Sequence, residues 1–104
     1  MASVRLSNQA YDDLNAIIGY ISLDLCNPQA AERFYQAVVK TLDLLKQNPC
    51  MYPLYPDEKL NAMGFRFVTV GNYLIFYLVN EHETIVTIVR IVYGKRNLSV
   101  VFEV

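Results

Sequence analysis

Four cations lie in or directly after the most strongly β-forming stretch of the chain. Arg66 and Arg90 fall within this stretch, and Lys95 and Arg96 follow it. Arginine side chains projecting from a sheet can hold phosphate groups through paired hydrogen bonds. The more ordinary interpretation is that these are strand-end cations or ion-pair partners of nearby glutamates. The residues alone favour the ordinary interpretation.

Other candidates for chemistry are few. Tyr93, beside Gly94, could orient a substrate or donate a proton, although a tyrosine at a strand end more often packs against its neighbours. His82 stands between two glutamates in a predicted turn and has no positioned partner that would make it a general base. The sequence has no phosphate-binding glycine loop, nucleophile elbow or metal-ligand spacing. We therefore expect no metal and no cofactor.

The cations are carried by a predicted three-stranded antiparallel meander. Its strands are Phe65–Val70, Tyr73–Val79 and Thr84–Val92, joined by turns at Gly71-Asn72 and Asn80–Glu83. Glycine and asparagine tolerate the positive φ of tight hairpin turns. The density of β-branched and aromatic residues favours strands throughout.

Both faces of this meander are apolar. In the middle strand, Leu74, Phe76 and Leu78 project to one face, and the alternating residues on the other face are apolar or aromatic as well. A sheet with one face in water alternates apolar and polar residues instead. Something must therefore cover both faces. Helices can cover one, and the chain's own loops, its C-terminal tail, self-association or a dedicated partner covers the other.

The first half of the chain predicts a short strand followed by two helices. Ser3–Leu6 is the strand, Ser7 caps the first helix, and Asn27-Pro28 begins a second helix that ends near Asn48-Pro49. Asp12 and Asp13 lie near the first helical turn, where the helix dipole favours negative charge. The short connection makes the helices antiparallel. The expected fold class is α+β, with a short N-terminal strand and an antiparallel helical hairpin packed on a small antiparallel sheet.

Size and composition limit the possible functions. With 104 residues, the chain is expected to form one domain over residues 1–104. Hydrophobic residues make up 54% and the mean hydropathy is +0.21, which suggests apolar surface destined for a partner. The net charge of −1 provides no overall positive field for nucleic acid or membranes. No signal-peptide pattern or membrane-spanning run is present, so we expect a cytoplasmic protein.

Two motifs in the meander resemble a known family. The stretch 70–77, VGNYLIFY, and the stretch 90–98, RIVYGKRNL, are similar to strands of the RelE/ParE superfamily of bacterial type II toxins. The resemblance extends to the order of elements along nearly the whole chain. It implies neutralisation by a cognate antitoxin, whose C-terminal segment wraps the toxin and covers apolar and cationic surface. The candidate antitoxin-binding residues are Leu74, Phe76, Leu78 and Arg90.

The RelE-like branch of the superfamily cleaves mRNA on the ribosome. By the strand motifs, Arg66 falls where that branch has a lysine, and Arg96 matches an arginine. Val68 replaces a second lysine, Leu74 replaces an arginine, and Phe102 stands where a tyrosine would be. Losing such groups is costly for a nuclease, because proton transfer and charge stabilisation each contribute orders of magnitude in rate. If the chain were RelE-like, Arg66, Lys95, Arg96 and Tyr93 would be its catalytic residues.

The ParE-like branch lacks this nuclease set and poisons DNA gyrase. The missing cations and the stretch 70–73, VGNY, favour this branch. We therefore predict the toxin of a type II toxin–antitoxin (plasmid stabilisation) system that acts on gyrase without catalysis of its own. The alternatives are a ribosome-dependent mRNA endonuclease or a non-toxic, degenerate family member. The expected partners are a cognate antitoxin and gyrase, or ribosome and mRNA, in a homodimer or a toxin–antitoxin hetero-oligomer.

Overall fold

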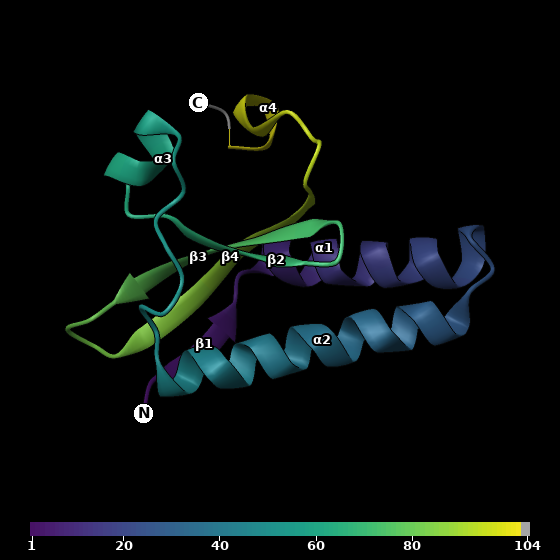
Figure 1. The fold of residues 1–104 in the computed structure, drawn as a ribbon, viewed down its shortest axis with the longest axis horizontal. Coiled ribbons are helices and arrows are strands. Elements are labelled where there is room, and N and C mark those ends of the chain that lie inside the picture. The colour runs from purple at the N-terminus through teal and green to yellow at the C-terminus, as the bar shows by residue number, and fades with distance from the viewer. Residues whose placement is uncertain (103–104) are drawn as a thin grey trace.

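The structure, a computed structural model, describes residues 1–102. Two long helices and a four-stranded sheet make up most of the fold, and two one-turn helices complete it (Figure 1). In chain order the elements are β1 (Ser3–Leu6), α1 (Asn8–Gly19), η1 (Tyr20–Asp24), α2 (Pro28–Gln47), α3 (Glu58–Ala62), β2 (Arg66–Val70), β3 (Tyr73–Asn80), β4 (Ile85–Tyr93) and α4 (Leu98–Phe102).

Both long helices begin at the predicted caps. The Ser7 hydroxyl accepts a hydrogen bond from the Ala10 amide at 3.0 Å, and the Asn27 side chain accepts one from the Ala30 amide at 3.0 Å. Each bond satisfies an amide that has no partner within its helix. The two helices run antiparallel, as predicted (Figure 1).

The first helical segment does not stay α-helical to its end. From Tyr20 to Asp24 it widens into the π-helix η1, and the Leu25 amide donates to the Tyr20 carbonyl at 3.0 Å. Cys26 then turns the chain with a φ of 51°. The spacing of apolar residues predicted the helical segment correctly. The change from α-helical to π-helical hydrogen bonds at its end depends on how the helical hairpin closes.

The sheet order is β1-β4-β3-β2. The pairs β2–β3 and β3–β4 are antiparallel, which confirms the predicted meander, and Gly71 has a φ of +59° in the first turn. β1 pairs with β4 in parallel, so the sheet is mixed rather than purely antiparallel. The helical hairpin between β1 and β2 provides the long connection that a parallel pair requires. The α+β class and the order of elements are confirmed.

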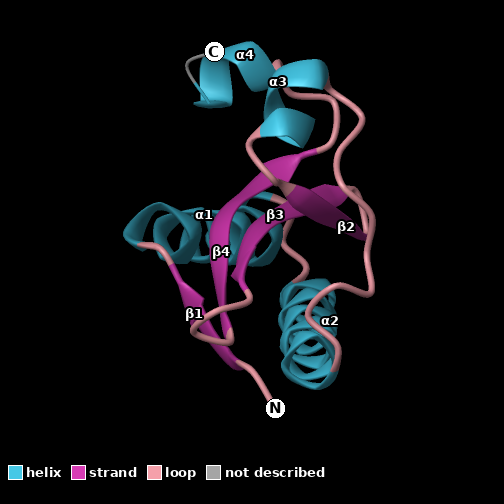
Figure 2. Ribbon diagram, turned by 90° about the vertical axis from the view of Figure 1, so that its left-hand side faces the viewer, coloured by secondary structure: helices cyan, strands magenta, loops and turns pink. Residues whose placement is uncertain are grey.

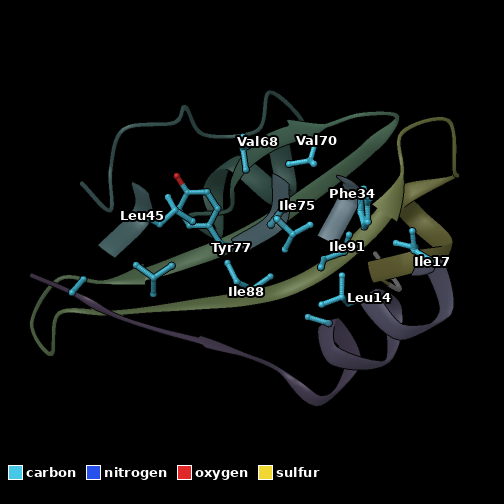
Figure 3. Packing of buried hydrophobic residues seen from close by; sticks show 14 residues of the cluster. Leu14, Ile17, Phe34, Leu45, Val68, Val70, Ile75, Tyr77, Ile88 and Ile91 are labelled. Atoms are coloured by element: carbon cyan, nitrogen blue, oxygen red, sulfur yellow. The ribbon is translucent and has the colours of Figure 1, made fainter. Parts of the chain in front are cut away.

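The larger hydrophobic cluster lies between the helical hairpin and the sheet, and we call it the helix-side cluster. Its buried members other than Ala2 come from α1, α2, β2, β3 and β4, and their side chains converge between the helices and the sheet (Figure 3). Leu45 and Tyr77 are fully buried in it. Its buried members are Ala2, Ala10, Leu14, Ile17, Phe34, Val38, Leu45, Val68, Val70, Ile75, Tyr77, Val86, Ile88 and Ile91.

A smaller cluster covers part of the opposite face, and we call it the far-side cluster. Its buried members are Leu60, Phe65, Phe76 and Val92. Figure 1 and Figure 2 show α3 and α4 together on the opposite side of the sheet from α2. The sequence left the chain after Asn97 undefined, and here it forms α4. The Phe102 ring lies 5.1 Å from the rings of both Phe65 and Phe76, measured between centroids.

Within residues 1–102, no helix is both long enough and apolar enough to cross a membrane. Cys26 and Cys50 are exposed free thiols.

Candidate functional site

Arg90, a candidate for antitoxin binding, is held inside the protein by Asp13 of α1. Its Nε and Nη2 atoms donate to the two carboxylate oxygens of Asp13 at 2.8 and 3.1 Å. Both side chains are about one-sixth exposed, with relative exposures of 15% and 16%. The hydrogen bonds to Asp13 raise the pKa of Arg90 further above its ordinary value. Arg90 is therefore a structural cation that joins α1 to β4.

Asp13 also takes the place of a neighbouring strand along part of β4, because it accepts a backbone hydrogen bond there. Beyond the short β1, no strand within residues 1–102 pairs with β4 on this side, and the Ile91 amide donates to the Asp13 carboxylate at 3.0 Å instead. Arg90 in turn donates to the Val101 carbonyl of α4 at 3.2 Å. Helix-dipole reasoning placed Asp13 near the first helical turn, and the structure places it just beyond that turn. No local signal links it to a residue 77 positions away.

Arg66 is bound to the loop between α2 and α3. Its Nη1 atom donates to the Tyr52 carbonyl at 2.6 Å, and the side chain is half-buried. In the sheet it pairs with Tyr77, so it projects to the helix side. Burial raises the pKa of Tyr77 to about 12, which keeps this neighbouring phenol neutral.

Lys95 and Arg96 lie in the turn after β4, with Tyr93 at the end of the strand. All three side chains are exposed, and within residues 1–102 no ion pair involves either cation. Tyr93 pairs with Tyr73 of β3, whereas Arg66 pairs with Tyr77, four residues further along the same strand. At about 3.3 Å per residue the offset along the strands is roughly 13 Å. The structure brings Tyr93, Lys95 and Arg96 together but keeps Arg66 apart from them.

Phe102 marks the place where the RelE-like branch would have a tyrosine. It packs on the far-side cluster against Phe65 and Phe76. Arg66 projects to the opposite face of the sheet. A side chain at position 102 therefore does not reach the guanidinium at position 66 in this structure.

The three apolar candidates for antitoxin binding project from β3 to the far side. Phe76 is fully buried beneath the rings of Tyr55 and Phe102, whereas Leu74 and Leu78 are half-buried. Of the three, Leu78 faces an open groove. That groove could be anticipated from the over-apolar strand, but which part stays open depends on where α3 and α4 lie.

We call this opening the hairpin groove, since it lies at the β3–β4 turn. It measures about 650 Å³. Half-buried Leu78, Ile85 and Thr87 contribute apolar surface to it, and Arg5, Glu81 and Glu83 contribute charge. β1 beside it is an edge strand that pairs with β4 alone. The groove therefore combines unprotected apolar surface with a free sheet edge, the usual features of a peptide-binding surface.

A second hollow lies at the other end of β3, and sequence reasoning did not identify it. It measures about 430 Å³ and is lined by Tyr20, Leu25, Asn72, Tyr73 and Tyr93. The rings of Tyr73 and Tyr93 meet edge to face with centroids 5.8 Å apart. Burial raises the pKa of Tyr73, and the neighbouring tyrosines add to the effect. We call this the tyrosine hollow.

Among the described residues, no three His, Cys, Asp or Glu side chains gather closely enough to hold a metal ion. Neither the hairpin groove nor the tyrosine hollow holds a nucleophile paired with a base. Their geometry supports binding more readily than catalysis.

Comparison with known families decides the classification. Residues 4–98 match the family model described as the ParE toxin of the type II toxin–antitoxin system parDE. The chain belongs to the ParE toxin family. This confirms the resemblance to the RelE/ParE superfamily and the preference for its ParE-like branch. No curated protein sequence matches the chain significantly.

Solved structures show that the ParE fold extends over nearly the whole chain. The chromosomal ParDE toxin–antitoxin system of P. aeruginosa is similar at 24% identity and a TM-score of 0.69, over 91% of this chain and 98% of that one. The toxin–antitoxin complex RelBE2 of Mycobacterium tuberculosis matches at 22% identity and a TM-score of 0.62, over 88% and 96%. The archaeal RelE–RelB complex of Pyrococcus horikoshii matches at 18% and 0.59, over 92% and 98%. At such low sequence identities, these matches show that the fold is shared.

Proposed function

We propose that this ParE-family chain is the toxin of a type II, plasmid-stabilising toxin–antitoxin pair, and that it acts by binding DNA gyrase. In this proposal the toxin has no catalytic activity, and a cognate antitoxin neutralises it. The family match and the ParDE complex among similar structures support the general assignment. The absence of a converging catalytic set among the described residues supports a binding mechanism.

The separation of Arg66 from Arg96 is the observation that carries this choice. A nuclease must place its cations and its proton-transfer group around one phosphate. Arg66 is bound to the Tyr52 carbonyl. Measured along the strands, the pairing positions of Arg66 and Tyr93 are roughly 13 Å apart. Tyr93, Lys95 and Arg96 remain together, which is the arrangement an alternative mRNA endonuclease would have to use.

A gyrase supercoiling assay tests the proposal. Titrating purified toxin into gyrase and relaxed plasmid should inhibit supercoiling and trap cleaved DNA. The Arg66→Ala variant should inhibit gyrase as strongly as the wild type does, since the Arg66 side chain is bound to the Tyr52 carbonyl within the toxin. Ribosome-dependent mRNA cleavage that Arg66→Ala and Arg96→Ala both abolish would overturn the proposal in favour of the nuclease. Absence of growth arrest, gyrase inhibition and RNA cleavage would identify a non-toxic member.

For the antitoxin we propose the hairpin groove as the main contact, with one antitoxin chain on each toxin. Leu78 from the predicted set contributes directly to the groove, and Leu74 offers partial exposure beside it. Phe76 and Arg90 support this surface from below rather than contacting the antitoxin directly, because both side chains are held by contacts within the chain. A partner segment laid along β1 would cover the free edge and the apolar surface together.

Two variants in the hairpin groove test this contact. Thr87→Lys and Leu78→Ser should each weaken binding of the protein encoded by the neighbouring gene about tenfold or more, as loss of a central interface contact does. The matched control is Leu23→Ser, since Leu23 is a highly exposed leucine outside the groove. Isothermal titration with folded variants gives the affinities. Equal affinities for all three variants would exclude the groove as the contact.

A further inference from the structure

The end of the molecule around the tyrosine hollow exposes an unusual number of large apolar side chains. Tyr20, Leu23, Leu25 and Tyr93 are 49%, 76%, 54% and 44% exposed. Tyr20 and Leu25 line the hollow with Tyr93, and Leu23 lies between them in chain order, within η1. Large aromatic and aliphatic surface exposed together marks an interaction site more often than isolated exposed residues do.

The hollow is accessible, and packing and hydrogen bonding hold its walls. Tyr73 packs against Phe34 of α2 at 5.2 Å between ring centroids, so the helix-side cluster supports its floor. The Gly94 amide donates to the Asn72 carbonyl at 2.9 Å and ties the β4 exit to the β2–β3 turn. Tyrosines held in this way offer large contact area at low entropic cost.

Exposed cations stand next to the hollow. Lys95 and Arg96 follow Tyr93 after one residue, Gly94, and no ion pair with either is present within residues 1–102. Asp24 is the acidic residue of η1, so this group of three charges has a balance of +1. A partner that fits must offer an apolar side chain for the hollow and negative charge for the two cations.

We propose that this end of the molecule is the docking surface for the toxin's target, a protein surface that presents an apolar side chain flanked by carboxylates. The inference deepens the proposed function, because it places gyrase binding on the tyrosine hollow together with Lys95 and Arg96. Leu23 and Leu25 favour a protein over a nucleic acid, since exposed leucines offer little to phosphates or base edges.

This surface is separate from the one proposed for the antitoxin. The tyrosine hollow lies at the Tyr73 end of β3 and the hairpin groove at the Asn80 end. Seven residues of strand amount to about 23 Å at 3.3 Å per residue. Variants at one end should therefore leave the other intact.

Growth arrest and two binding assays test the inference. The variants are Tyr20→Ser combined with Tyr93→Ser, and Lys95→Glu combined with Arg96→Glu. Tyr35→Ser is the matched control, because Tyr35 is 41% exposed on α2, outside both surfaces. We expect each double variant to reduce growth arrest and binding to immobilised gyrase at least tenfold, and to keep the wild-type affinity for the antitoxin. The control should match the wild type in all three.

The outcomes separate the two proposals. Double variants that arrest growth as strongly as the wild type overturn the docking surface, and so do folded variants that lose antitoxin binding as well. A wild-type toxin that arrests growth without binding gyrase overturns the gyrase proposal alone. In that case, loss of growth arrest in the double variants still supports the docking surface. A wild-type chain that neither arrests growth nor binds gyrase overturns both.

Discussion

The two faces of the sheet are covered in different ways. Two long helices close the helix side, where fourteen buried residues form one continuous cluster. Among the residues whose burial the structure describes, the far side has four buried ones beneath two one-turn helices and a loop. Beyond that cover, the hairpin groove leaves apolar surface open at Leu78 and Ile85. Because both faces are similarly apolar in sequence, the difference lies in what each face packs against.

The two faces of the sheet are therefore expected to contribute differently to stability and to function. A continuous cluster supplies most of the free energy of unfolding, since buried apolar area is its largest favourable contribution. A thinly covered face is where a partner can still bury apolar area. We therefore expect the helix side to determine whether the chain folds, and the far side to determine how the antitoxin binds.

Truncating one side chain on each face measures the contrast most directly. Leu45→Ala on the helix side should lower the free energy of unfolding by about 4 kcal/mol, and Phe102→Ala on the far side by about 2 kcal/mol. Leu45 is fully buried, whereas Phe102 is only half-buried at the edge of its cluster. Urea denaturation of both variants provides the comparison. Equal losses would mean that α4 is as much a part of the core as α2.

The Asp13–Arg90 pair joins the two regions, and breaking it should cost slightly less than the Leu45 change. Asp13→Asn leaves a mostly buried guanidinium without its charge partner, which costs about 3 kcal/mol. Asp12→Asn is the matched control, because Asp12 is exposed on the same helix. Thermal unfolding should show a large drop for position 13 and almost none for position 12. A small drop at both would mean that Arg90 finds other acceptors.

The smallest effect at neutral pH concerns the phenol inside the helix-side cluster. In the unfolded chain Tyr77 should titrate near its ordinary pKa of about 10, while burial raises the folded pKa to about 12. Between these values the unfolded state loses a proton that the folded state keeps. Stability should therefore fall as pH rises from about 10 to 12, at no more than about 1.4 kcal/mol per unit.

Tyr77→Phe removes the contribution of this phenol and should make the fall of stability with pH shallower in that interval, while Tyr11→Phe on the exposed face of α1 should not. Urea midpoints measured at several alkaline pH values give the slopes. Identical slopes for the wild type and Tyr77→Phe would show that the phenol titrates normally in the fold.

The sequence alone determined the features that depend on neighbours along the chain. Ser7 and Asn27 cap helices through amides three residues away, and Gly71 allows the turn between β2 and β3. Alternating apolar residues predicted the strands, and their combination with the helical hairpin predicted the α+β class. The motifs of β3 and β4 carried the family resemblance, since they too are contiguous.

Only the tertiary structure decided which charged and aromatic side chains meet. Arg90 pairs with a residue on the first helix, and Tyr20 lines the same hollow as Tyr93 from the opposite half of the sequence. Such pairs leave no periodic pattern, because their spacing along the chain is set by intervening loops rather than by helix or strand geometry. The position of α4 over Phe76 likewise depends on packing that no short segment contains. Long-range contacts thus left Leu78 open to a partner and held Arg90 in a mostly buried ion pair.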